Sequence, residues 1–219
     1  SLDALVRGDE ALAEQVVARD KRIDALEIEV DKLAVRIIAL RAPMADDLRE
    51  VIAALKIGGV LERIGDYSKN IAKRVGMIEG RARFEPLTLL PTMGELAGEM
   101  VHDVLTAYAA RDPDLAREVI ATDAKVDGFY NSIFRNLVSY MVENPSTISS
   151  AAQLLFVARN IERIGDHHRV HARQALDPDL VDASFVRDRL SDGNLSIDDD
   201  LVRSIADNGQ EVPILVREH

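Results

Sequence analysis

The chain has 219 residues, 47% of them hydrophobic and only 4% aromatic, and its formal net charge at pH 7 is −11. The absence of cysteine excludes disulfide bonds, thiolate zinc sites and a cysteine nucleophile, and it fits a reducing cytoplasm. The acidic balance argues against non-specific DNA binding, and no uncharged run is long enough to span a bilayer. The abundance of Leu, Ala, Glu and Arg favours an all-α fold.

The first half of the chain predicts two long helices joined by a short turn. Residues 1–7 have the pattern of the end of an earlier helix, and Asp9 is a suitable N-cap for the next one. Apolar residues then recur at helical spacing over residues 10–41, and Pro43 marks a turn. A second helix of the same kind is expected over residues 45–77.

The second half repeats this plan with three helices. Two prolines and a glycine in residues 79–91 predict a linker, and the next helix begins near Leu87 or Thr92. Asp112 followed by Pro113 is a strong start signal for a further helix, which extends to about residue 143. After a turn around Pro145, the last helix extends to about residue 174.

We therefore expect an all-α protein of two repeated three-helix bundles. The first repeat covers residues 1–80, where residues 1–7 represent a truncated first helix, and the second covers residues 86–175. The segment 176–219 is polar and loop-like, so it is expected to be mostly irregular. Some forty residues with few apolar side chains cannot build a core of their own.

One motif occurs twice, one hundred residues apart. Leu61-Glu62-Arg63-Ile64-Gly65-Asp66 returns as Ile161-Glu162-Arg163-Ile164-Gly165-Asp166, with five consecutive identical residues. The Glu and Asp of each copy are four positions apart and share one face of a helix. Like charges at that spacing destabilise a helix by about 0.2–0.5 kcal/mol. The repetition predicts that each pair holds a cation.

The preceding helix of each half adds more carboxylates to the pattern. Asp20 and Asp24 correspond to Asp123 and Asp127 at an offset of 103, and antiparallel neighbouring helices would bring them to the motif. Carboxylates without cysteine select hard or borderline cations: Mg, Mn, Fe, Ca or Zn. The metal ligands predicted for the two sites are Asp20, Asp24, Glu62 and Asp66, and Asp123, Asp127, Glu162 and Asp166.

Simpler interpretations of these residues stay open. The carboxylates could lie on solvated faces and form surface ion pairs, which contribute little to stability. Glu99 and His102 match half of a ferritin-type di-iron pattern, but that pattern needs two such pairs. His167 and His171 are four apart and could share a cation. The sequence has no Gly-rich phosphate loop, His-Glu-x-x-His or nucleophile elbow, so we expect no catalytic apparatus.

These motifs resemble those of the PhoU family of phosphate-uptake regulators over residues 1–174. The resemblance rests on residues 17–24, on residues 55–57 leading into the first motif and residues 70–72, and on residues 160–167. It implies two three-helix bundles with pseudo-twofold symmetry, each binding a metal cluster through the eight carboxylates named above. Asn70 fits the family pattern, whereas its counterpart Val170 does not, so the second site is expected to be less complete.

The resemblance also implies a function. A PhoU protein is a non-enzymatic cytoplasmic regulator that reaches the membrane only through its partners. It connects the ATPase of the Pst phosphate transporter to a sensor histidine kinase and represses the phosphate regulon when phosphate is plentiful. The resemblance also implies a homodimer that binds Fe, Mn, Mg or Zn. No nucleic acid is expected to bind the bundles.

The end of the chain suggests a different class of protein. Residues 177–217 resemble the opening of the N-terminal domain of ParB/RepB plasmid-partition proteins, with a short helix, a turn at Asn208-Gly209 and a strand. The Arg-rich nucleotide-binding motif and the helix-turn-helix of those proteins are absent. The alternative function is therefore DNA segregation, with the helices as a dimerisation arm. A di-metal oxidase is a third alternative, which the single Glu-x-x-His disfavours.

Overall fold

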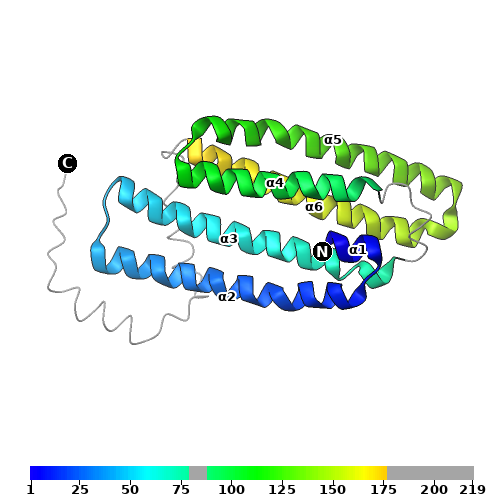
Figure 1. Ribbon diagram of the computed structural model, residues 1–219, viewed down its shortest axis with the longest axis horizontal. Coiled ribbons are helices and arrows are strands. Elements are labelled where there is room, and N and C mark those ends of the chain that lie inside the picture. Colours follow the sequence, from blue (N-terminus) through cyan, green and yellow to red (C-terminus); the bar gives the residue numbers. More distant parts are fainter. Residues whose placement is uncertain (79–87, 177–219) are drawn as a thin grey trace.

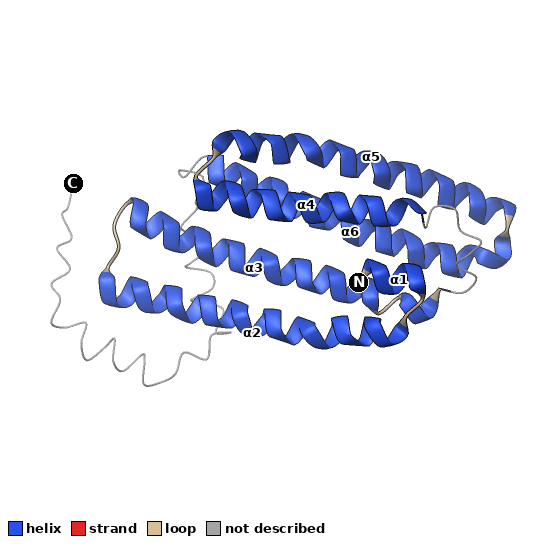
Figure 2. Cartoon of the chain, viewed as in Figure 1, coloured by secondary structure: helices blue, strands red, loops and turns tan. Residues whose placement is uncertain are grey.

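The computed structural model describes residues 1–78 and 88–176, and this part of the chain is helical throughout its regular elements (Figures 1 and 2). In chain order the elements are α1 (Leu2–Arg7), α2 (Glu10–Arg41), α3 (Asp46–Ala72), η1 (Val75–Met77), α4 (Leu89–Ala110), α5 (Pro113–Glu143), η4 (Pro145–Thr147) and α6 (Ile148–Leu176). The all-α prediction is confirmed. The segment compared with partition proteins lies outside the described residues. No helix in the described ranges has the length and apolar character needed to cross a membrane.

Helices α4, α5 and α6 form a complete three-helix bundle in the second half. Each helix contributes fully buried apolar side chains to a shared core, including Met93, Met100, Ile133, Leu137 and Leu154. The start of α5 follows the expected chemistry: Asp112 Oδ1 accepts from the backbone N–H groups of Asp114 and Leu115, and Pro113 occupies the first turn.

The first bundle is built from α2, α3 and the short α1. Helices α2 and α3 run side by side along most of their length, while α1 packs at one end of them (Figure 1). Between α2 and α3 lies an open groove of about 450 Å³, lined mainly by apolar side chains such as Ile23 and Val30. Their counterparts at the offset of 103, Val126 and Ile133, are fully buried in the bundle that contains α4.

The two bundles meet along α3 and α6 (Figure 1). The hydroxyl of Tyr67 lies 2.9 Å from Nε2 of His167, and their rings stack with centroids 5.6 Å apart. These two residues are one hundred positions apart and directly follow the two motifs. A contact between equivalent residues is consistent with a twofold relation between the halves, because such residues meet near the axis.

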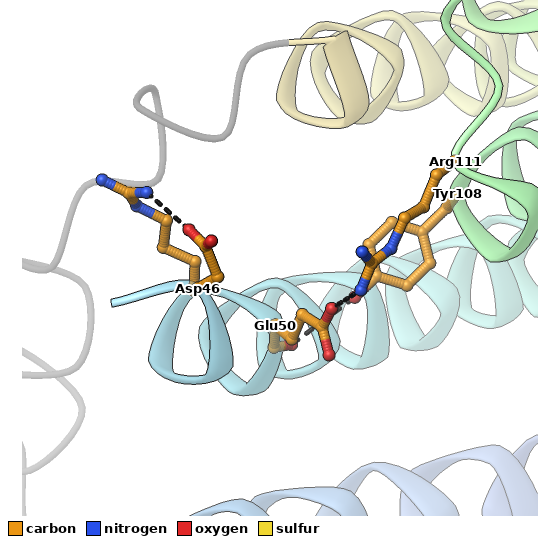
Figure 3. A network of polar contacts seen from close by, with 5 residues as sticks. Asp46, Glu50, Tyr108 and Arg111 are labelled. Atoms are coloured by element: carbon orange, nitrogen blue, oxygen red, sulfur yellow. Dashed lines mark hydrogen bonds and ion pairs between the residues drawn. The ribbon is translucent and has the colours of Figure 1, made fainter. Parts of the chain in front are cut away.

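A second polar contact joins the bundles near the start of α3. Arg111, directly after α4, forms an ion pair with Glu50, and the Tyr108 hydroxyl donates to the backbone carbonyl of Glu50 at 3.5 Å (Figure 3). Both side chains of the ion pair are exposed, so its contribution to stability is small.

Candidate metal centres

Each half of the molecule buries one aspartate against a glycine of the repeated motif. Asp20 on α2 and Asp123 on α5 are both only 4% exposed. A Cβ atom placed on Gly65 would lie 3.1 Å from Oδ1 of Asp20, and one on Gly165 would lie 3.2 Å from Oδ1 of Asp123. The two glycines therefore let each aspartate approach the backbone of the neighbouring helix. The solvated-face interpretation is wrong for both aspartates.

The first carboxylate cluster consists of Asp20 and Asp24 on α2 and of Glu62 and Asp66 on α3. Burial raises the pKa of Glu62, and the charges of Asp66, Glu27 and Asp24 raise it further, together with a hydrogen bond to Asp66. Such coupling requires these side chains to lie near one another. Asp24 and Glu27 of α2 therefore contribute negative charge at Glu62 of α3.

A lysine neutralises part of this negative charge. Lys69 Nζ donates to Oδ2 of Asp20 and to Oδ1 of Asp66, and so connects α2 with α3. These two bonds raise the pKa of Lys69 above its usual value. Lys69 is not among the residues predicted from the sequence, although its position three residues after Asp66 puts it on the same helix face.

The second carboxylate cluster consists of Asp123 and Asp127 on α5 and of Glu162 and Asp166 on α6. Its basic residue is an arginine instead of a lysine. Burial raises the pKa of Glu162, which is 8% exposed, and the nearby charges of Asp166 and Asp127 add to this. Arg159, three residues earlier on α6, donates to Oε1 of Glu162 and opposes the shift. Asp127 of α5 therefore contributes negative charge at Glu162 of α6, as Asp24 of α2 does at Glu62 of α3.

Each cluster contains one buried carboxylate oxygen without a hydrogen-bond partner. They are Oδ1 of Asp20 in the first cluster and Oε2 of Glu162 in the second. Leaving a buried polar atom unsatisfied costs about 1–3 kcal/mol, and a cation would remove that cost. The donor set therefore fits a hard cation. Within residues 1–78 and 88–176, however, no three Asp, Glu or His side chains already surround a common point, so binding requires side-chain movement.

The weaker histidine candidates differ from these clusters. Glu99 and His102 are exposed on α4. His167 contacts Tyr67, and burial and the charge of Arg63 lower its pKa. The side chain of His171 lies outside the described residues, so a shared cation at this pair stays a prediction.

A family model described as the PhoU domain matches residues 1–75 and 90–174. The chain belongs to the PhoU family. Among curated relatives, the phosphate-specific transport system accessory protein PhoU homolog of Zymomonas mobilis is 55% identical over 167 residues, or 76% of this chain and 70% of the relative. PhoU of Escherichia coli is 41% identical over 167 residues, or 76% of this chain and 69% of the relative.

Solved PhoU structures share the fold. PhoU from Pseudomonas aeruginosa superimposes with a TM-score of 0.76 at 37% identity, covering 80% of this chain and 84% of that one. The phosphate transport system regulatory protein PhoU from Streptococcus pneumoniae gives 0.75 at 25% identity, covering 83% and 85%. The two-bundle PhoU architecture predicted from the sequence is therefore confirmed. The relatives are accessory and regulatory proteins, in agreement with the expected non-enzymatic role.

The PhoU match ends at residue 174. It does not reach the segment compared with ParB/RepB proteins.

Proposed function

We propose that this PhoU protein is a regulator of phosphate uptake whose two carboxylate clusters bind metal ions. Family membership supports the regulatory role, because the relatives are accessory and regulatory proteins of phosphate transport. The observation that carries the metal proposal is one buried, unpartnered carboxylate oxygen in each cluster, on Asp20 and on Glu162.

In this proposal each cluster takes ligands from two helices. Asp20 and Asp24 of α2 act with Glu62 and Asp66 of α3, and the second set is Asp123, Asp127, Glu162 and Asp166. A bound Mn, Fe, Mg or Zn ion supplies positive charge that compensates the carboxylates. Once the metal ion compensates the repulsion among the carboxylates, the first set holds α2 to α3 and the second set holds α5 to α6.

The partners follow from the family as proposals. We infer that the protein acts in the cytoplasm as a homodimer and contacts the ATPase of the phosphate transporter and a sensor histidine kinase. Its net charge of −11 suits basic surfaces on such partners. Co-purification of the ATPase with the tagged chain tests this, and failure to retain it at low salt would count against the proposal.

Metal analysis of two double variants tests the metal proposal. The variant Glu62→Gln with Glu162→Gln removes one carboxylate from each cluster without changing side-chain volume. We expect its Mn²⁺ affinity to fall at least about tenfold, equivalent to about 1.4 kcal/mol. The measurement is calorimetric titration of chelator-treated protein.

The matched control removes two charges away from the clusters. Asp46 and Asp114 have side chains that are 87% and 86% exposed. The variant Asp46→Asn with Asp114→Asn should therefore bind Mn²⁺ as the parent does. Unchanged Mn²⁺ binding in the Glu62→Gln, Glu162→Gln variant would show that the ligands are assigned wrongly.

A further inference from the structure

Lys69 occupies the space between the two helices of the first cluster. Its Nζ contacts one oxygen of Asp20 on α2 and one oxygen of Asp66 on α3. The side chain of Lys69 is 23% exposed, while Asp20 beneath it is 4% exposed. The ammonium group therefore lies over a buried carboxylate and links two helices that would otherwise repel each other here.

The aspartate under Lys69 lies close to the backbone of α3. Its Oδ1 lies 3.1 Å from the position of a Cβ on Gly65, and the same position is 2.9 Å from Cδ1 of Ile23. Asp20 therefore lies against α3 at the glycine, beside Ile23 of its own helix. The ammonium contacts Oδ2 of Asp20, whose Oδ1 has no partner, so a metal ion bound by this carboxylate would share it with the ammonium.

A metal ion and the Lys69 ammonium would compete for the carboxylates of Asp20 and Asp66. A divalent ion within bonding distance of Asp20 and Asp66 would lie a few ångströms from the ammonium, and their repulsion in a partly buried site is large. A metal can gain these ligands only if the lysine leaves them. The long side chain of Lys69 can do so, because it has four rotatable methylenes and a path to solvent.

We propose that Lys69 is a built-in counter-cation of the first cluster, which holds Asp20 and Asp66 in the metal-free protein and must leave them before a metal ion binds. This inference rests on the proposed metal site. If Lys69 leaves, metal binding changes the surface of α3, because the ammonium group moves from between the helices into solvent. Lys69 thereby sets the metal affinity of the first cluster.

The second cluster serves as an internal reference. There Arg159 contacts Glu162 from the same helix, three residues away, and is 46% exposed. The position equivalent to Lys69 in the repeat is Arg169, whose side chain lies outside the described residues. A substitution of Lys69 should therefore change metal binding at the first cluster and leave metal binding at the second cluster unchanged.

Mn²⁺ titration of the full chain, followed by the paramagnetic resonance signal of free Mn²⁺, tests the proposal. Lys69→Met removes the charge and keeps an unbranched side chain, and Lys73→Met makes the same change at an exposed position after α3. We expect Lys69→Met to tighten, at least about tenfold, the site that Glu62→Gln weakens. Lys73→Met should match the parent.

A second measurement uses the parent protein and does not depend on how the variant folds. Lysine acylation by an N-hydroxysuccinimide ester, read by peptide mass spectrometry, reports whether each ammonium group is free in solvent. We expect saturating Mn²⁺ to increase labelling of Lys69 severalfold and to leave Lys73 unchanged.

The outcomes separate the two proposals. If the parent binds Mn²⁺ but Lys69→Met binds it no more tightly, or if Lys69 labelling does not rise, the counter-cation role is overturned and the metal site stands. If neither the parent nor Lys69→Met binds Mn²⁺, the metal proposal itself is overturned, and the role of Lys69 with it.

Discussion

Glu62 and Glu162, the glutamates of the two repeated motifs, both have a raised pKa. Burial is the largest cause of the raised pKa in both, and neighbouring carboxylates add to it. An acid with a raised pKa in the folded state holds its proton more tightly there than in the unfolded chain. The metal-free protein therefore loses stability as pH rises through the interval between about 4.5, the ordinary value, and the raised pKa.

Glu62→Gln should remove this loss at the first cluster. We expect chelator-treated Glu62→Gln to be more stable than the parent at neutral pH. The gain in the free energy of unfolding should be about 0.2–0.5 kcal/mol or more, the cost of one like-charge pair. The gain should disappear below pH of about 4.5, where the parent is protonated as well. Thermal denaturation at several pH values measures it, with Asp46→Asn as the exposed control. A variant less stable than the parent at neutral pH would contradict the interpretation.

At this scale the sequence identified the acids better than the bases. The spacing of Glu62 and Asp66 on one helix face is a local property, so it was predictable. The bond from Lys69 to Asp20 joins residues 49 positions apart, and it depends on how closely two helices approach. Whether the eight carboxylates bind metal stays a prediction.

Glycines explain how closely those helices approach. Gly65 and Gly165 face a neighbouring helix at distances that a Cβ atom would make tight, whereas a Cβ on Gly98 or Gly128 would meet nothing within 4 Å. All four glycines lie inside helices, where glycine is about 1 kcal/mol less favourable than alanine. Only the first two have packing that compensates for this.

Alanine substitutions should separate the two kinds of glycine. Gly98→Ala and Gly128→Ala should raise the free energy of unfolding by up to about 1 kcal/mol. Gly165→Ala should gain less, or lose stability, because its Cβ would press on Asp123 and Val126. Urea denaturation measures the difference. Equal gains at Gly128 and Gly165 would show that close packing is not the reason for the glycine.

The helices themselves were largely predictable from local signals. The start of α5 follows from Asp112 and Pro113, and α2 has the expected bounds because its apolar spacing is regular. The end of α3 was placed too late: the helix stops at Ala72, and the turn η1 covers Val75–Met77. Apolar periodicity continues through that turn, so it could not mark the change from α-helix to a 3₁₀ turn.

At the scale of the whole molecule, the duplicated sequence became a duplicated structure. The repeat predicted two bundles, and the PhoU match covers both. The repeat did not indicate that α3 and α6 meet through Tyr67 and His167, because periodicity within one helix contains no information about its partner. The division into residues 1–80, 86–175 and 176–219 stays our proposal for the functional units.

Tyr67→Phe tests how much this junction contributes. The change removes one hydroxyl whose hydrogen bond to His167 links the halves, and a bond of this kind contributes about 1 kcal/mol. We expect that loss at pH 7.5, measured by thermal denaturation. The lowered pKa of His167 makes the folded state bind protons less well, so the parent should lose stability as pH falls below about 6.5.

One result of comparing Tyr67→Phe with the parent would contradict the proposed role of the Tyr67 hydroxyl. If the two proteins have the same stability at pH 7.5, the hydroxyl does not hold the bundles together. The stacked rings alone would then account for the contact.

The open groove on the first bundle has a consequence for motion. Helices α2 and α5 have almost the same length, 32 and 31 residues, but they bury different apolar residues. Those of α2 are Ala13 and Ala34, whereas those of α5 are Ala116, Val119, Val126, Ile133 and Leu137. Separating α2 from its neighbour therefore wets less apolar surface than separating α5 does. Local opening costs least where fewest apolar contacts break, so we expect the backbone amides of α2 to exchange with solvent before those of α5.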